Sequence, residues 1–197
     1  MSEQTSIRQA IEKLLNKNKE NKIDLTEFYL TILDDDLAKI LSKHQGDLVY
    51  NQDFLYDTSD SAVECLSKIK GKLYFGSISE INETQAKIFA KHNGGGLYIS
   101  THHLDPDHYD WSYPFQPSNQ VLQILSEYKG ELGLGMRALT SPTQAEILLN
   151  HSGGLVLLDY IILSKDVINI LKKYSFKIND LSPDKFVHSE FICSSIL

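Results

Sequence analysis

Residues 85–99 read QAKIFAKHNGGGLYI, in which apolar residues at helical spacing lead through a histidine and three glycines into alternating apolar residues. The first half places its apolar side chains on one side of a short helix. The second half has the two-residue alternation of a strand with one buried face. Glycine between the halves permits the backbone conformation that ends a helix. This stretch therefore predicts one helix–turn–strand unit.

The pattern recurs along the chain, and each copy contains an anchor residue that stands where His92 stands in residues 85–99. The other copies are 37–50 (LAKILSKHQGDLVY), 62–75 (AVECLSKIKGKLYF), 121–134 (VLQILSEYKGELGL), 144–157 (QAEILLNHSGGLVL) and 167–180 (VINILKKYSFKIND). The anchors are His44, Ile69, His92, Tyr128, His151 and Tyr174. Successive anchors are 25, 23, 36, 23 and 23 residues apart, which indicates a 23-residue repeat with one large insertion. In all six copies the residues six, four and three places before the anchor are apolar.

Such a unit cannot bury its apolar faces alone, so stacking of the copies is the expected solution. The sequence predicts an α/β solenoid of about six helix–turn–strand units with a parallel sheet and capped ends. One buried ladder is expected from Leu48, Leu73, Leu97, Leu132 and Leu155. Helix caps are expected at Asp60, Thr84, Asn119, Thr143 and Asp166. We interpret residues 1–197 as one repeat domain, with an N-terminal cap at 1–33, repeats at 34–180, an insertion at about 101–120 and a C-terminal cap at 181–197.

These columns resemble the bacterial leucine-rich-repeat-like proteins with a 23-residue AxxLAxHxGxLxL type repeat. The resemblance is carried by AKILSKHQGDL at 38–48, AKIFAKHNGGGL at 86–97 and AEILLNHSGGL at 145–155, and covers about residues 34–180. It implies a leucine-rich-repeat-like solenoid and protein binding as its commonest use. It names no substrate, because a fold does not determine a function.

Composition narrows the class of partner. The formal net charge is −7, and Arg8 and Arg137 are the only arginines, which disfavours nucleic-acid recognition. The polar start of the sequence and the absence of a long apolar run predict a cytoplasmic protein with no membrane contact. An acidic chain suits a basic protein partner, because opposite charges steer association.

The insertion is the strongest candidate contact region. It contains the single tryptophan and three aspartates, with no lysine or arginine between residues 101 and 120. Because large aromatic side chains often anchor protein interfaces, we predict partner contacts there. The predicted partner-binding residues are Asp105, Asp107, Tyr109, Asp110, Trp111, Tyr113 and Phe115. A metal-dependent hydrolase site is the alternative, with nitrogen and oxygen donors from His102, His103, Asp105, Asp107, His108 and Asp110.

A second candidate surface is the outward face of the sheet, where Tyr74 and Tyr98 follow buried leucines. The recurrent histidines are expected to be structural, since Ile69 occupies the same column and cannot replace a metal ligand. The Gly runs follow a helix rather than precede one, so no phosphate loop is predicted. We therefore expect no metal, no cofactor and no enzymatic activity. The favoured function is a bacterial immunity protein that neutralises a basic toxin by direct binding, and the alternative binding role is an adaptor or scaffold.

Overall fold

The computed structural model describes residues 3–18, 21–28, 30, 33–51, 58–76, 78, 80–100, 115–136, 138–158, 162–171 and 177–178. The α-helices are α1 (Glu3–Lys17), α2 (Asp35–Leu41), α3 (Asp60–Leu66), α4 (Glu83–Phe89), α5 (Asn119–Ser126), α6 (Pro142–Leu149) and α7 (Lys165–Leu171), with a 3-10 helix η1 at Thr26–Phe28. The strands are β1 (Ile23–Asp24), β2 (Leu48–Asn51), β3 (Leu73–Gly76), β4 (Gly96–Ser100), β5 (Glu131–Gly135), β6 (Ala138–Leu139), β7 (Leu155–Leu158), β8 (Ile162–Leu163) and β9 (Lys177–Ile178).

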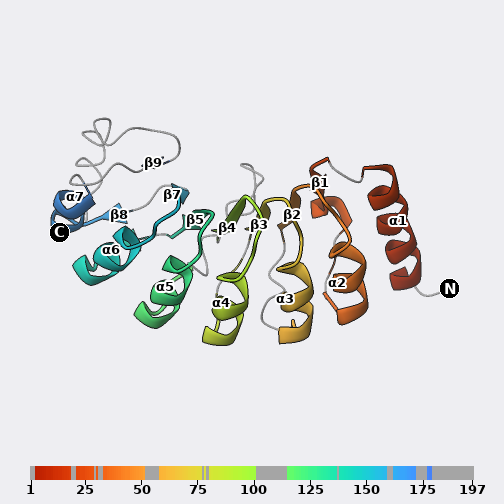
Figure 1. Ribbon diagram of the computed structural model, residues 1–197, viewed down its shortest axis with the longest axis horizontal. Helices are drawn as coiled ribbons and strands as arrows, with labels where there is room; N and C mark the ends of the chain where they lie inside the picture. The colour runs from red at the N-terminus through yellow and green to blue at the C-terminus, as the bar shows by residue number, and fades with distance from the viewer. Residues whose placement is uncertain are drawn as a thin grey trace.

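The main sheet confirms the predicted α/β class. Seven of the described strands form it in the order β1-β2-β3-β4-β5-β7-β9, and every neighbouring pair is parallel. Strands β6 and β8 form a separate parallel pair. Figure 1 shows the helices in one row along one face of this open sheet, in chain order. The crossover between neighbouring strands therefore passes through a helix on the same face each time.

The predicted leucine ladder is confirmed by the strand register. Leu48 pairs with Leu73, Leu73 with Leu97, Leu97 with Leu132, and Leu132 with Leu155. Four of these five side chains are 0% exposed, and Leu155 is 8% exposed. In the cap predicted for residues 1–33, Ile23 of β1 pairs with Leu48, so the ladder extends to the first strand.

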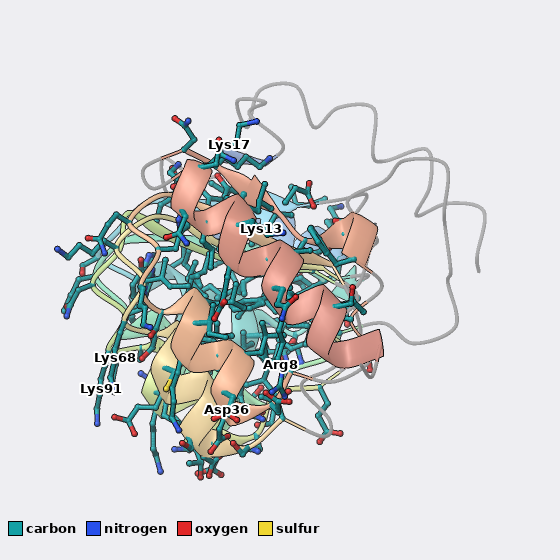
Figure 2. All side chains as sticks on the ribbon, turned by 90° about the vertical axis from the view of Figure 1, so that its right-hand side faces the viewer. Arg8, Lys13, Lys17, Asp36, Lys68 and Lys91 are labelled. Carbon is teal, nitrogen blue, oxygen red and sulfur yellow. The ribbon has the colours of Figure 1, made fainter. Side chains whose placement is uncertain are left out.

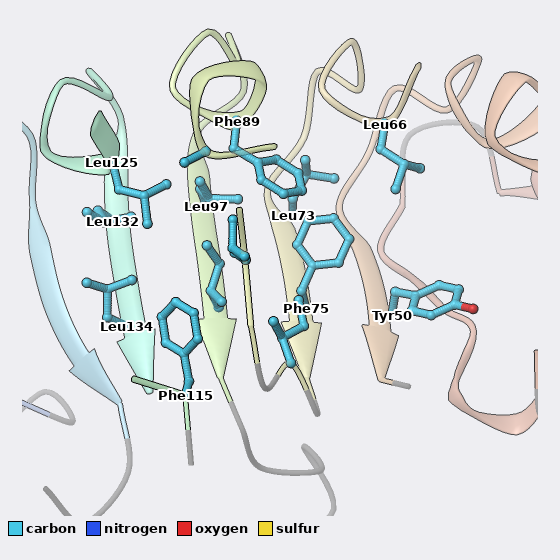
Figure 3. Packing of buried hydrophobic residues seen from close by; sticks show 14 of the residues in the cluster. Tyr50, Leu66, Leu73, Phe75, Phe89, Leu97, Phe115, Leu125, Leu132 and Leu134 are labelled. Atoms are coloured by element: carbon cyan, nitrogen blue, oxygen red, sulfur yellow. The ribbon is translucent and has the colours of Figure 1, made fainter. Parts of the chain in front are cut away.

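The helices close the core from one side. The residue three places before each anchor points toward the sheet, and the buried members of this column are Leu41, Leu66, Phe89, Leu125, Leu148 and Leu171. Figure 3 shows Leu66, Phe89 and Leu125 facing the side chains of the strands. The ring of Phe89 lies 5.2 Å from that of Phe75 on β3, measured between centroids. One continuous apolar layer therefore lies between helices and sheet.

The helix caps differ from the sequence prediction by one or two residues. The side chains that accept a hydrogen bond from the first helical turn belong to Asp34, Ser59, Asn82, Ser118, Ser141 and Ser164. At α4, Asn82 accepts from the amide of Gln85, whose side chain accepts from the Asn82 amide in return, forming a capping box. The predicted caps Thr84 and Asn119 lie inside α4 and α5 instead.

The turns between helix and strand are packed against one another through glycine. A Cβ atom on Gly71 would lie 2.5 Å from the amide nitrogen of Asp47, and closer still to the carbonyl oxygen of Gly46. A Cβ atom on Gly94 would clash with the carbonyl oxygen of Gly71 in the same way, and one on Gly153 would clash with that of Gly130. Only glycine allows successive turns to approach this closely.

The anchor side chains confirm the structural role predicted for the histidines. His151 places Nδ1 3.1 Å from the Ser126 carbonyl oxygen and Nε2 3.0 Å from that of Gly130. His92 places Nδ1 2.9 Å from the Ser67 carbonyl oxygen. Burial lowers the pKa of His92, although nearby backbone carbonyl groups oppose the shift. These imidazoles bond the backbone of the preceding helix and turn.

Tyr128 also forms a hydrogen bond to the backbone of the preceding turn, through its hydroxyl group. It donates to the Gly94 carbonyl oxygen over 2.8 Å, and burial raises its pKa to about 12. Its ring lies between those of His92 and His151, at centroid distances of 5.9 and 6.4 Å. Three successive anchors, His92, Tyr128 and His151, thus form a row of stacked rings within the turns.

The insertion predicted at about 101–120 falls among the described residues only from Phe115 onward. Phe115 is 0% exposed and belongs to the apolar core, as Figure 3 shows. Ser118 caps α5, which begins at Asn119, so the last residues assigned to the insertion belong to the helix and its entry. A side chain buried at this depth offers no surface to a partner, which argues against the partner-binding role predicted for Phe115.

Candidate functional site

The outward face of the sheet carries the second candidate surface predicted from the sequence. Strand alternation directs the residue after each ladder leucine away from the helices. In register these residues are Val49, Tyr74, Tyr98, Gly133 and Val156. The register therefore places Tyr74 and Tyr98 side by side in this column, on the outward face that the sequence predicted for them.

Two tyrosine rings lie stacked at the centre of the row. The centroids of Tyr74 and Tyr98 are 4.4 Å apart, and the rings are inclined by only 11°. The ring of Tyr98 also covers Gly133 on the next strand, where an added Cβ atom would lie 3.0 Å from Tyr98 Cε1 and closer to Cδ1. Glycine at position 133 leaves the space that lets Tyr98 lie across β5.

The two tyrosines differ in exposure. Tyr98 is 8% exposed, because Tyr74 covers one side of its ring and β5 the other, whereas Tyr74 is half-buried. The sequence predicted both as contact residues. In the structure Tyr74 offers the accessible ring, and Tyr98 supports it from beneath.

Charged residues flank the stacked rings. Lys72 Nζ donates to the Tyr98 hydroxyl over 3.0 Å and to Glu131 Oε1 over 3.1 Å, and it lies 5.4 Å from the centroid of the Tyr98 ring. Lys22 Nζ lies 5.6 Å from the centroid of the Tyr74 ring. Asp47 accepts a hydrogen bond from the Lys72 amide over 2.8 Å. We call Lys22, Asp47, Lys72, Tyr74, Tyr98 and Glu131 the sheet-face cluster.

Electrostatics favours the protonated forms of Lys72 and Tyr74 within this cluster. Burial favours a lower pKa for Lys72, but its hydrogen bond to Glu131 and the nearby carboxylates outweigh burial, so the pKa is raised. Burial raises the pKa of Tyr74, against the attraction of Lys72 for the phenolate. Both Lys72 and Tyr74 therefore remain protonated near neutral pH, so a positive charge lies beside a neutral ring.

The cluster has the properties of a contact surface. Tyr74 has its ring held by Tyr98, so little side-chain freedom remains to be lost when a partner packs on it. Lys72 is held by two hydrogen bonds, and its half-exposed ion pair with Glu131 leaves a donor for a further acceptor. The cluster therefore places a free Lys72 donor beside an apolar ring face of Tyr74.

Sequence reasoning missed the charged members of the cluster. Lys22, Asp47, Lys72 and Glu131 each stand two residues before an outward-facing position, in the column that also contains Gly96. Two residues is the repeat of a strand, so extending the alternation beyond the leucines toward the turn would have found them. The sequence prediction considered only the outward positions that follow the ladder leucines, and these include Tyr74 and Tyr98 but none of the four charged residues.

The predicted insertion site falls largely outside the described residues. Six of the predicted partner-binding residues lie outside the described part of the chain: Asp105, Asp107, Tyr109, Asp110, Trp111 and Tyr113. The histidines of the alternative metal site lie outside it too, namely His102, His103 and His108. Within the part of the chain that the structure describes, no three His, Cys, Asp or Glu side chains are grouped to hold a metal ion. Among the described helices, none has the length and apolar character needed to cross a membrane.

Comparison with known proteins gives no match. The chain matches no protein-family model, no curated protein and no solved structure.

Proposed function

We propose that this chain is a non-enzymatic protein-binding module built as a leucine-rich-repeat-like solenoid. The support for a solenoid is the register, which aligns equivalent leucines of successive helix–strand units, and the equivalent contacts made by glycines and anchors of successive turns. Each unit then contributes one residue to every column on the sheet face. A binding surface of this kind is assembled from single positions of several strands.

The observation that carries the proposal is the half-buried ring of Tyr74, stacked at 4.4 Å on a buried tyrosine and flanked by Lys22 and Lys72. An aromatic side chain that is already ordered contributes more to binding, because less entropy is lost on association. The accessible ring of Tyr74 is the part available to a partner.

The partner we propose is a basic toxin or effector domain, with this chain as its bacterial immunity protein in the cytoplasm. The net charge of −7 and the aspartates of the insertion favour a basic partner. Asp47 and Glu131 in the sheet-face cluster offer carboxylates to the same surface. The insertion and the sheet-face cluster would then serve one partner. The aspartates of the insertion would raise its association rate, and the cluster would form the contacts that hold the complex.

The test begins with capture of the partner from the source cell and of the protein encoded beside this chain. Calorimetric titration then compares the parent protein with Tyr74→Ala and Tyr74→Phe. Loss of an interface aromatic costs roughly 2 to 4 kcal/mol of binding. Tyr74→Ala should show that loss, whereas Tyr74→Phe keeps the stacked ring and should bind within about 1 kcal/mol of the parent.

A helix-face change, Gln123→Ala on α5, serves as the control for unrelated surface effects. Equal binding by the parent and Tyr74→Ala would remove the sheet-face cluster from the interface. For toxin neutralisation, the captured partner must be harmful to cells when produced alone and harmless when produced with the parent chain. A captured partner that is harmless alone contradicts the immunity role.

A further inference from the structure

A row of lysines follows the carboxyl ends of three neighbouring helices. Lys39 and Lys43 come from α2 and its following turn, Lys68 and Lys70 follow α3, and Lys87 and Lys91 belong to α4 and its following turn. All six side chains are exposed. We call these six residues the basic edge. Lys43, Lys68 and Lys91 occupy the same place in their units, one residue before the anchor.

Helix geometry does not require these lysines. Cations near a helix carboxyl end are favoured by the helix dipole, and α5 and α6 present the same dipole. The matched positions there are Gln123, Glu127, Lys129, Glu146, Asn150 and Ser152. Only one of these is cationic and two are acidic, so the basic edge is a property of α2, α3 and α4 rather than of the repeating unit.

An open cavity lies within the basic edge, between the ends of α3 and α4. It has a volume of about 460 Å³, and its lining includes Lys68, Lys70, Lys91, Ser67, Asn93 and Ile88. Figure 2 shows Lys68 and Lys91 on the same side of the molecule. The cavity thus combines three cationic groups with an amide and a hydroxyl group over a half-buried isoleucine.

Half of the charge of the basic edge is balanced along the helices. Lys68 lies 3.2 Å from Glu64, which also lines the cavity, and Lys39 and Lys87 have exposed carboxylate neighbours one turn away. Such exposed pairs are weak and exchange readily with other anions. Lys43, Lys70 and Lys91 form no ion pair with any described residue.

We propose that the basic edge binds an acidic segment of a partner protein, with a carboxylate side chain in the cavity between α3 and α4. The negative charges elsewhere on the chain do not oppose this, because screening limits their reach to about 8 Å at physiological salt. This site is separate from the sheet-face cluster and does not depend on the function proposed for it.

The chemistry of the edge favours a polypeptide over a nucleic acid. Among the described residues that line the cavity, none is aromatic and none is arginine, so bases would find neither a stacking ring nor a bidentate donor. Ile88 and the lysine stems suit the methylene groups of a glutamate side chain instead. Lysine supplies single point charges, which match separate carboxylates.

The test measures fluorescence anisotropy of a labelled eight-residue polyglutamate peptide at physiological salt, about 0.15 M, with the polyglutamine peptide as a neutral probe. The parent protein should bind the polyglutamate peptide, and added salt should weaken the binding. The triple variant Lys68→Gln, Lys70→Gln, Lys91→Gln should bind about tenfold more weakly, which corresponds to about 1.4 kcal/mol. A labelled single-stranded DNA of the same charge is measured in parallel.

The matched control removes three lysine charges elsewhere, as Lys13→Gln, Lys17→Gln, Lys129→Gln. It has the same net charge as the edge variant, and circular dichroism checks that both variants fold. The control should bind the peptide like the parent. Equal losses in the two variants, or no binding of the peptide by the parent, would overturn the proposal. Tighter binding of the DNA that depends on the basic edge would overturn the assignment to an acidic polypeptide.

Discussion

Replacement of Gly71 by alanine tests the contact between successive turns. The added methyl carbon would lie 2.5 Å from the Asp47 amide nitrogen, whereas real Cβ atoms essentially never lie closer than 3.0 Å to such atoms. The obstacle is backbone, so no rotamer change relieves it. The two turns must separate by at least about half an ångström at this atom, since overpacking is relieved by backbone movement.

Two neighbouring hydrogen bonds would be stretched by that separation. The Leu48 amide donates to the Lys72 carbonyl oxygen over 2.9 Å, and the Lys72 amide donates to Asp47 over 2.8 Å. Overpacking costs about 1 to 3 kcal/mol, and a weakened hydrogen bond costs up to about 1 kcal/mol. Alanine also restricts the unfolded chain, which returns about 0.4 to 1 kcal/mol. We expect a net loss of about 2 kcal/mol in the free energy of unfolding.

Urea denaturation followed by far-ultraviolet circular dichroism measures this loss, with Gly95→Ala as the matched control. A Cβ atom on Gly95 has its nearest neighbour, Lys72 Cγ, at 3.7 Å, an ordinary contact. The control should therefore be as stable as the parent or slightly more stable. Equal stability of Gly71→Ala and Gly95→Ala would refute the close packing of turns.

Further predictions concern the helix layer and pH. Leu148→Ala, at a side chain 1% exposed, should lower the free energy of unfolding by about 2 to 5 kcal/mol in the same assay, and a loss below roughly 0.5 kcal/mol would contradict its place in the core. Because burial lowers the pKa of His92 below 6.5, the unfolded chain binds more protons as pH falls through 6.5, so stability should be full above this pH and decline below it. Urea titrations between about pH 5.5 and 7.5 should show this slope, and His92→Gln should flatten it, which an unchanged slope would contradict.

The layers of the fold could be predicted because the repeat supplies the same evidence several times. One leucine in a short apolar run decides little, but Leu48, Leu73 and Leu97 share a column at equivalent places in successive copies and must share a layer if the copies stack. The helix column that contains Leu66 and Leu125 follows for the same reason. Periodic burial is a property of the whole unit, so it survives substitutions in single copies.

Details that depend on one backbone conformation could not be predicted in this way. At α3, Ser59 and Asp60 both have side chains able to cap, and the choice falls on Ser59 because its backbone is extended, at φ −65° and ψ 150°. Phe115 lies in no repeat column, and its aromatic neighbours in the sequence suggested exposure. It is buried with the other apolar residues that lead into the helices, among them Leu33, Ile81 and Leu139.

The candidate site was predicted in part for a physical reason. Apolar periodicity identified Tyr74 and Tyr98 on the sheet face, yet exposure depends on which ring lies above the other, and that follows from Gly133 on the neighbouring strand. The charges of Lys72 and Glu131 meet only because β3 and β5 lie on either side of β4. The spacing of the two residues along the chain does not predict this ion pair.

Lysine footprinting of the complex is the most direct test of the sheet-face cluster as the binding surface. Acetylation of free and partner-bound protein, read by mass spectrometry, reports which lysines the captured partner covers. We expect Lys22 and Lys72 to lose reactivity on binding, while Lys13 on α1 and Lys165 on α7 react as in the free chain. Unchanged reactivity of Lys22 and Lys72 in a saturated complex would contradict this expectation.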